Sequence, residues 1–286
     1  MADPSLRAAL SNNEFLLAPG VFDLISALIA DGEAFNALYV TGYGTVASYL
    51  GLPDAGIATY RDMIERIAQI AKMTRKPIIA DADTGYGGLI NVRHTIRGYE
   101  DAGVSAIQLE DQEFPKKCGH TPNRTVVPAA DMVRKIEVAV DSRRSDDFLI
   151  IARTDSRSAH GIDEAIRRGK AYAKAGADVI FIESPETRDE MLKVADEIDA
   201  PLFANMVNGG LTPLLSADDL HKMGYSIAIH PAIGFLSAGA ALKKAYADLA
   251  RHGLSSKEIE VYPFAEFNKL LGFDDIWAFE KKYAEI

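Results

Sequence analysis

Short apolar runs alternate with helical patterns eight times along this chain, and this alternation limits the folds open to it. The runs at 149–152 and 179–182 are continuously apolar, which suits strands covered on both faces in a parallel sheet. The segment 60–73 between two runs is amphipathic, and Thr59 with Asp62 resembles a capping box. Repetition of this kind predicts an α/β fold, a (β/α)₈ TIM barrel. The expected strands are 15–18, 37–41, 77–81, 106–110, 148–152, 179–183, 202–205 and 226–230.

We expect a single barrel domain over residues 1–286, because no linker or low-complexity tract divides the chain. The tail 255–286 is rich in aromatic side chains that need a surface to pack against. This C-terminal helical extension could dock on its own barrel or on a neighbouring subunit, and we favour the neighbour in a homo-oligomer. The aromatic residues are Tyr262, Phe264, Phe267, Phe273, Trp277, Phe279 and Tyr283.

Charge and cysteine content narrow the class of protein. The chain has 31 basic and 41 acidic residues, a net charge of −10, which disfavours a general nucleic-acid binder because such affinity comes from clustered Lys and Arg. Its apolar stretches are strand-sized, so no membrane span is expected. Cys118 is the only cysteine, which rules out an intramolecular disulfide. With no signal-peptide pattern at the start, these features favour a cytoplasmic protein.

Acidic residues stand where two neighbouring strands are expected to end. Asp81 and Asp83 follow the third run, and Glu110 ends the fourth. The carboxyl ends of barrel strands meet at one mouth, where active sites form, so these carboxylates can converge on Mg²⁺, which takes oxygen ligands. The segment does not match a calcium-binding loop, because the sixth and twelfth positions counted from Asp81 are Tyr86 and Val92 instead of Gly and Glu. It does not match a dinucleotide-binding fingerprint either, because the third glycine of that pattern is missing after Gly85 and Gly87. Each acid alone is more simply a helix cap, so the prediction depends on their joint placement.

The connection 111–130 is longer than is usual in α/β units, which indicates a lid or binding loop. It holds Cys118 among Lys116, Lys117 and His120. A lone cysteine is more often a small buried side chain, but positive charge favours the thiolate, and a loop can carry it to a substrate. We therefore expect Cys118 to be functional.

Arg153 is expected at the end of the fifth strand, where its guanidinium could bind a substrate carboxylate. The alternative is an ion pair with Asp155 or Glu183, and both can hold together. Isolated polar residues elsewhere are usually turn or cap residues. Candidates for binding a second carboxylate are nevertheless Asn205, Thr212 and His120.

Six segments together resemble one enzyme family. They are Tyr-Val-Thr-Gly-Tyr-Gly at 39–44, Gly-Leu-Pro-Asp at 51–54, Asp-Ala-Asp-Thr-Gly-Tyr-Gly at 81–87, Leu-Glu-Asp-Gln at 109–112, Lys-Lys-Cys-Gly-His at 116–120 and Ala-Arg-Thr-Asp at 152–155. Over nearly its whole length the chain resembles the isocitrate lyase and phosphoenolpyruvate mutase superfamily of Mg²⁺-dependent barrels. The cysteine element marks the carbon–carbon lyase branch, which includes lyases for 2-methylisocitrate and 2,3-dimethylmalate, whereas phosphonomutases lack that cysteine.

The resemblance implies two sets of site residues, matched position by position. The metal set, for Mg²⁺ or possible Mn²⁺, is Asp83 with Asp81 and Glu110, directly or through water, and Asp54 nearby. The substrate set is Thr41, Gly42, Tyr43, Lys116, Lys117, Gly119, His120, Arg153, Glu183, Asn205 and Thr212. Many members have Ser at position 41, where Thr keeps the hydroxyl. Members are commonly tetramers that exchange a terminal helix, which would account for the aromatic tail.

The implied substrate is a small hydroxy-carboxylate or oxo-acid. Loss of the 2-hydroxyl proton lets a carbonyl form as the C2–C3 bond breaks, and the departing carbons become an enolate-like carboxylate. The resemblance implies that Cys118 protonates this carbanion and that Tyr39, assisted by Arg153 or the metal, handles the hydroxyl proton.

Other functions remain open at this point. Oxaloacetate hydrolysis or decarboxylation would make a similar enolate on the same barrel, although hydrolytic relatives carry a serine in the segment that matches 230–233, which is absent here. Phosphonomutase-type chemistry is disfavoured by Cys118. A non-catalytic binding barrel is a remote alternative, since such a protein could lose the acids and the cysteine without penalty.

Overall fold

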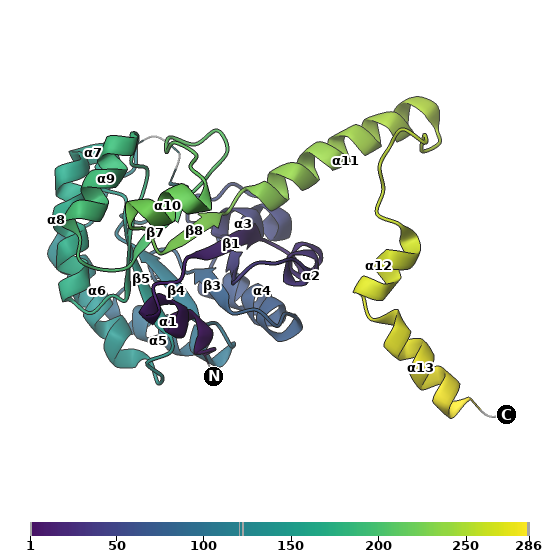
Figure 1. Cartoon of the computed structure of the whole chain (residues 1–286), viewed down its shortest axis with the longest axis horizontal. Coiled ribbons are helices and arrows are strands. Elements are labelled where there is room, and N and C mark those ends of the chain that lie inside the picture. The colour runs from purple at the N-terminus through teal and green to yellow at the C-terminus, as the bar shows by residue number, and fades with distance from the viewer. Residues whose placement is uncertain (1, 120, 122, 285–286) are drawn as a thin grey trace. The chain divides into compact units, whose positions relative to one another are not determined.

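The computed structural model describes residues 2–119, 121 and 123–284. Eight parallel strands close into a barrel in which each strand pairs with the next along the chain and β8 pairs with β1 (Figure 1). This confirms the predicted (β/α)₈ architecture. The strands are β1 (Leu16–Val21), β2 (Leu38–Val40), β3 (Ile78–Asp81), β4 (Ala106–Glu110), β5 (Leu149–Thr154), β6 (Val179–Ile182), β7 (Leu202–Asn205) and β8 (Ile227–His230).

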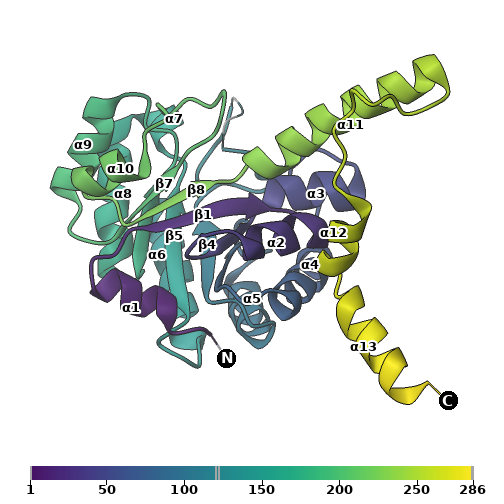
Figure 2. The same cartoon turned by 45° about the vertical axis from the view of Figure 1, so that its right-hand side comes forward.

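Helices surround the barrel (Figure 2). In α4 (Tyr60–Met73) the predicted capping box is present, because Thr59 and Asp62 each accept a hydrogen bond from the other's backbone N–H. The other helices that begin before residue 236 are α1 (Ser5–Ser11), α2 (Leu24–Gly32), α3 (Gly42–Leu50), α5 (Leu89–Asp101), α6 (Ala129–Ser142), α7 (Arg157–His160), α8 (Ile162–Lys174), α9 (Arg188–Glu197), α10 (Ala217–Met223) and α11 (Ile233–His252).

Two strands are longer than the apolar runs predicted. β1 continues to Val21, and Gly20 lets it pass close to the end of β8: a Cβ at Gly20 would lie 2.2 Å from the carbonyl oxygen of Pro231. β5 continues to Thr154, because Arg153 pairs in register with Glu110 on β4. The backbone ladder therefore extends beyond the apolar side chains that marked the strand in the sequence.

The core has two layers, which explains the continuous apolar runs. Ile79 belongs to the cluster inside the barrel, whereas Ile78 and Ala80 belong to the cluster between strands and helices. Successive side chains of a strand point to opposite faces, so a strand buried on both faces is apolar throughout. Leu6 and Ala9 of α1 join the interior cluster at the end of the barrel remote from the strand carboxyl ends.

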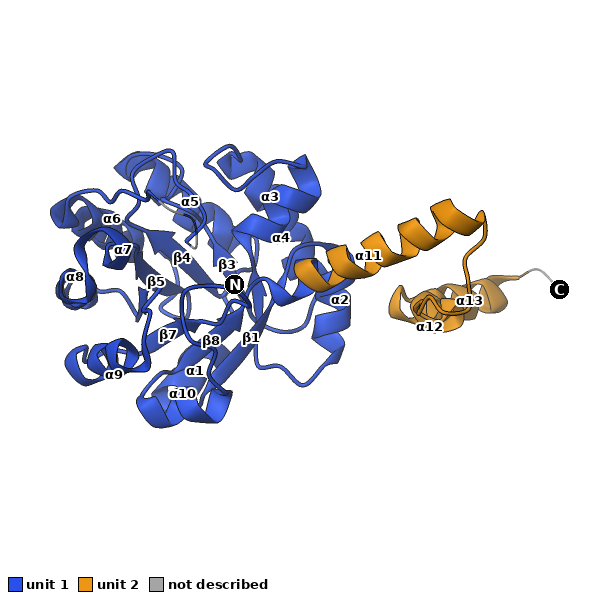
Figure 3. Ribbon diagram, turned by 90° about the horizontal axis from the view of Figure 1, so that it is seen from above, with its two compact units in different colours: residues 1–235 blue, residues 236–286 orange. Residues whose placement is uncertain are grey.

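Residues 236–286 form a second compact unit, drawn in orange in Figure 3. It contains most of α11, then α12 (Phe264–Leu270) and α13 (Phe273–Tyr283). None of the described residues in these helices is buried, and Phe264 and Trp277 are 81% and 49% exposed. Packing of this tail on another subunit stays a prediction. Among the described residues, no helix combines the length and apolarity needed to cross a membrane.

Candidate active site

The polar residues predicted at strand ends lie together at the carboxyl end of the barrel. Register places Asp81 beside Gln108 and Glu110 beside Arg153 on adjacent strands. All are buried, with exposed fractions of 8% or less, although they are polar or charged. Buried charges need partners or a ligand, so this end of the barrel is where chemistry is expected.

A tight turn after β3 holds Asp83 above the strand ends. Asp83 has a positive φ of 49°, a conformation that costs free energy for a residue other than glycine. Its N–H donates to Oδ1 of Asp81 at 3.0 Å, and its carbonyl accepts from the N–H of Glu110 at 2.9 Å. The backbone thus ties together the three acids that the sequence predicted to converge.

Lys116 of the long loop reaches into this acidic region. Its Nζ lies 2.5 Å from Oδ1 of Asp54 and 2.6 Å from Oδ1 of Asp83, and its side chain is 4% exposed. Burial alone would lower the pKa of Lys116, but the carboxylates of Asp83 and Asp54 outweigh burial and raise this pKa well above its ordinary value. Lys116 is therefore a firmly held ammonium between two of the predicted metal ligands.

The acids exceed the cations that face them. Burial raises the pKa of Asp83 to about 7; Lys116 opposes this shift, and Asp81 and Asp54 add to it. Burial also raises the pKa of Glu110 well above its usual range, although Arg153 opposes the shift. Crowded carboxylates of this kind favour a further cation.

The donors fit a hard cation in kind. The four predicted ligands, Asp54, Asp81, Asp83 and Glu110, all offer carboxylate oxygens. Oε1 of Glu110 is buried without a hydrogen-bond partner in the described part of the chain. Among the described residues, however, no three acidic, histidine or cysteine side chains have the spacing of a metal centre, and Lys116 stands between Asp54 and Asp83. Metal binding therefore stays a prediction.

Arg153 makes the ion pairs that were its alternative role. Its Nε and Nη2 donate to the two carboxylate oxygens of Asp155, both at 2.9 Å. Nε also lies 3.4 Å from Glu110, and Nη2 lies 3.3 Å from Glu183. These contacts fix the guanidinium at the barrel mouth, where a substrate carboxylate could share it.

Tyr39 lies inside the barrel beside Gln108. Its hydroxyl donates to Oε1 of Gln108 at 3.0 Å, and burial, with the nearby Asp81, raises its pKa well above the ordinary value. The predicted handling of the hydroxyl proton by Tyr39 stays a prediction. Sequence reasoning missed Gln108; its one signal is an amide inside an apolar run.

Most of the remaining residues predicted to bind substrate lie at the same end of the barrel, and one of them, Tyr43, is exposed. Asn205 Nδ2 donates to Oε2 of Glu183 at 3.1 Å, beside Arg153, and Thr212 is buried. Thr41 is the N-cap residue of α3 and Gly42 is the first residue of the helix, where an added Cβ would lie 2.6 Å from Oδ2 of Asp81. Tyr43 differs: the residue is 40% exposed, and its ring stacks on that of Phe235 with centroids 5.2 Å apart.

The loop segment 116–119 is docked against the strand-end residues of the site. The N–H of Cys118 donates to the carbonyl of Asp54 at 3.3 Å, and Ser184 Oγ donates to the carbonyl of Gly119 at 3.0 Å. Gly119 packs so closely that an added Cβ would lie 2.3 Å from Nη2 of Arg153. His120, predicted to bind substrate, lies outside the described residues.

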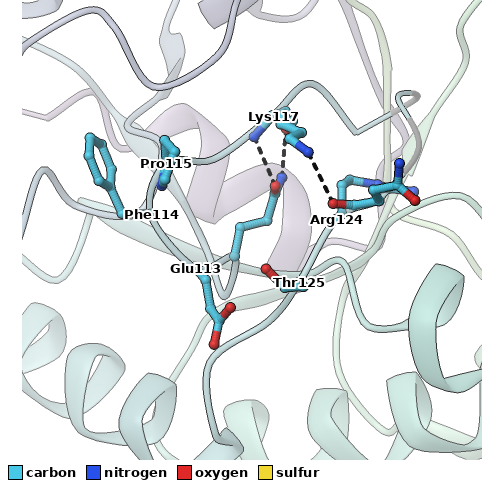
Figure 4. A pocket seen from close by; sticks show the side chains of 8 residues that line it. Glu113, Phe114, Pro115, Lys117, Arg124 and Thr125 are labelled. Atoms are coloured by element: carbon cyan, nitrogen blue, oxygen red, sulfur yellow. Dashed lines mark hydrogen bonds between the residues drawn. The ribbon is translucent and has the colours of Figure 1, made fainter.

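The base of the loop is braced by hydrogen bonds. The Gln112 amide accepts from the N–H of Lys117 at 3.0 Å and donates to its carbonyl at 2.8 Å, and Lys117 Nζ donates to the carbonyl of Asn123 (Figure 4). The side chain of Lys117 is thus bonded within the loop, and its binding of substrate stays a prediction. A cavity of about 280 Å³ lies here, lined by Gln112, Glu113, Phe114, Pro115, Lys117, Asn123, Arg124 and Thr125.

Comparison with known proteins shows the relatives of this chain. A family model described as phosphoenolpyruvate phosphomutase matches residues 6–250. The 2,3-dimethylmalate lyase of Eubacterium barkeri is 45% identical over 280 residues, which cover 98% of this chain and 97% of that protein. A 2-methylisocitrate lyase of Aeropyrum pernix is 39% identical over 98% of this chain and 90% of its own length.

Solved structures show the same fold over the full chain. Oxaloacetate acetylhydrolase with 3,3-difluorooxalacetate superposes with a TM-score of 0.92 at 34% identity, covering 99% of this chain and 97% of the other. Phosphonopyruvate hydrolase with oxalate and Mg²⁺ gives 0.88 at 31% identity, covering 100% of both chains. The chain therefore belongs to the phosphoenolpyruvate mutase/isocitrate lyase superfamily, and its homologues identify it as a carbon–carbon lyase of that superfamily.

Proposed function

We propose that this enzyme uses Mg²⁺ to cleave a 2-hydroxy di- or tricarboxylate of the 2,3-dimethylmalate or 2-methylisocitrate type. The products are an α-ketoacid such as pyruvate and a carboxylic acid. The observation that carries the proposal is a buried set of acids beneath a docked loop that bears Cys118; the acids are Asp54, Asp81, Asp83 and Glu110. The two lyase relatives described above are named for these substrates.

Asp83 would hold the metal, with Asp81 and Glu110 helping directly or through water and Asp54 nearby. These oxygen donors suit Mg²⁺, for which Mn²⁺ can substitute, and one relative's structure is described as containing Mg²⁺. When bound, the ion supplies charge that stabilises oxygens of the reacting substrate. The excess of buried acid in this region supports the assignment.

The α-ketoacid portion of the substrate would lie between α3 and β5. Thr41 precedes α3, its side chain makes no capping bond among the described residues, and Gly42 is the first helical residue. Free N–H groups at a helix start attract anions, so a carboxylate is stabilised there. Arg153, held by Asp155, would bind the same group from the other side.

The loop would supply the final proton. The 2-hydroxyl would give its proton to a base, the role predicted for Tyr39 with the help of Arg153 or the metal. Once the C2–C3 bond has broken, the electron pair remains on the departing carbon. Cys118 would donate its Sγ proton to that carbon, leaving a thiolate in a loop that also holds Lys116 and Lys117. Docking of 116–119 would keep water away from the carbanion.

Oxaloacetate cleavage is the second candidate. The likeness to oxaloacetate acetylhydrolase, at 34% identity over 99% of the chain, favours it, and the departing enolate is similar. The lyase relatives at higher identity and the cysteine loop favour the first candidate. Phosphorus–carbon chemistry has less support, because transfer of a phosphoryl group needs no acid to protonate a carbanion. Such a reaction would leave the proposed role of Cys118 without a use.

A coupled assay separates these functions. The protein with Mg²⁺ is given 2,3-dimethylmalate, 2-methylisocitrate, isocitrate or oxaloacetate, and release of α-ketoacid is followed through NADH oxidation by lactate dehydrogenase; acetate and oxalate are measured separately for oxaloacetate. We expect turnover of a hydroxy-acid that stops when EDTA is added. Turnover of oxaloacetate alone, or turnover that persists in EDTA, would contradict the proposal.

We also propose a cytoplasmic homotetramer in which the tail 255–286 packs on a neighbouring subunit. The apolar side chains of α12 and α13 support this, because a soluble protein rarely leaves so many of them in water. Within the described tail, Phe273 contacts Trp277 and Phe279 contacts Tyr283, so α13 carries two pairs of aromatic rings.

A further inference from the structure

Gln108 is a fully buried amide inside the barrel, level with Asp81 and one layer below Glu110. It lies on β4 with 0% exposure, and the side chains that fill the barrel interior beneath it are apolar. An amide in such a layer is costly unless its donor and acceptor groups are satisfied. The structure supplies a partner on each side, Tyr39 and Asp81.

This hydrogen-bond chain has a single direction. Only the nitrogen of a side-chain amide donates, and Gln108 presents its Nε2 to Oδ1 of Asp81, at 3.3 Å. Its Oε1 then faces Tyr39, whose hydroxyl donates at 3.0 Å. Reversal of the amide would place Oε1 against Oδ1 of Asp81, so Asp81 selects this orientation of Gln108, and Tyr39 stabilises it by donating to Oε1.

The same contacts orient the carboxylate of Asp81. Oδ1 receives Gln108 Nε2 and the N–H of Asp83, at 3.3 and 3.0 Å. Oδ2 lies on the side of Gly42, where an added Cβ would come within 2.6 Å of it. Two donors thus occupy one oxygen and leave the other for a ligand, in a space that only glycine keeps open.

We propose that Tyr39 and Gln108 are positioning residues, a relay that turns Asp81 so that Oδ2 is available to a divalent cation. The inference rests on the proposed Mg²⁺ site. Partners behind a metal ligand commonly set its affinity, and their loss costs roughly 10- to 100-fold. A merely structural polar pair in the core would instead lower stability and leave metal affinity unchanged.

The test measures Mn²⁺ binding to the full-length, substrate-free protein by isothermal titration calorimetry. We expect Gln108→Met to raise the Kd for Mn²⁺ by roughly 10- to 100-fold and Tyr39→Phe to raise it by less. If Tyr39 acts only through Gln108, the double variant binds Mn²⁺ no more weakly than Gln108→Met alone. Ser105→Ala is the matched control: Ser105 is also fully buried and directly precedes β4 at its opposite end, so its Kd should equal that of the wild type.

Each result decides between the two proposals. A wild type that binds no Mn²⁺ would overturn the metal site and this inference with it. If the wild type binds Mn²⁺ and both Gln108→Met and Tyr39→Phe bind it with the wild-type Kd, the positioning role alone is overturned. Tyr39→Phe removes a single oxygen atom, so it carries the test by itself if Gln108→Met does not fold, as judged by circular dichroism.

Discussion

Arg124 and Asp155 form a buried ion pair that connects the loop to the barrel, with Nη1 2.6 Å from Oδ1. Their side chains are 1% and 0% exposed. The same carboxylate of Asp155 accepts two hydrogen bonds from Arg153. One buried carboxylate therefore couples the position of the loop to the orientation of the guanidinium proposed to bind substrate.

Arg124→Met should lower the free energy of unfolding by about 1–3 kcal/mol, because Asp155 loses a charged hydrogen-bond donor in a buried place. It should also raise KM, since the loop is released and Arg153 is less firmly held. Urea denaturation and steady-state kinetics measure the two effects. The control is Arg61→Met, which removes an ion pair with Glu65. The side chains of Arg61 and Glu65 are 84% and 50% exposed, so this substitution should change the free energy of unfolding by less than about 1 kcal/mol. Equal effects of the two substitutions would contradict the role given to Arg124.

The sequence predicted the barrel and the clustering of strand-end residues because both follow from local patterns. Period and apolarity identify strands, and parallel strands necessarily bring Asp81, Glu110 and Arg153 to one end. The ends of β1 and β5 were not predicted, because backbone pairing continues past the apolar side chains.

Contacts that depend on tertiary closure could not be predicted. Arg124 meets Asp155 only because the loop folds back over the barrel, and nothing in the linear pattern distinguishes Arg124 from other basic loop residues. Ser184 holds the carbonyl of Gly119 from a left-handed backbone conformation, with φ 58°, that its residue type does not suggest. The placement of Lys116 between Asp54 and Asp83 likewise required side-chain directions.

Cys118→Ser should lower kcat by roughly 10²- to 10⁴-fold with little change in KM, because a hydroxyl is a much weaker acid than a thiol. Steady-state assays with the best substrate of the coupled screen measure this. Thr121→Val is the control, since the Thr121 hydroxyl donates to the carbonyl of Cys118 at 2.7 Å and supports the same turn without touching the thiol's chemistry. An unchanged kcat in Cys118→Ser would exclude the proton-donor role.

Gly119→Ala should prevent docking of the loop. The new Cβ would lie 2.3 Å from Nη2 of Arg153 and 2.8 Å from the carboxyl carbon of Glu183, and Arg153 is held in place by its ion pairs. We expect kcat/KM to fall by about 10²-fold and limited proteolysis within 111–130 to accelerate. Gly32→Ala, where nothing lies within 4 Å of the added carbon, should change neither quantity.

Trp277→Ser should weaken the proposed subunit assembly. Trp277 is 49% exposed, and burial of its ring by another subunit would make it a major contributor to the interface. Native mass spectrometry over a dilution series should show smaller species at higher protein concentration than for the wild type. Lys281→Ser, at the end of the same helix, is the control. A wild type that stays monomeric at all concentrations would contradict the assembly itself.

Glu164→Gln should reduce stability in a manner that depends on pH. Hydrogen bonds from Arg167, with Arg168 adding to them, lower the pKa of Glu164 to about 2 from an ordinary value of 4.5. Because the folded-state pKa is depressed, its stabilisation is fully present above pH 4.5 and is lost as the pH falls towards 2. Glu164 is partly exposed, so solvent screening limits the effect to about 1 kcal/mol or less. Urea midpoints of wild type and variant should therefore differ at pH 7 and converge as the pH approaches 2, and a constant difference would show that the ion pairs are not its source.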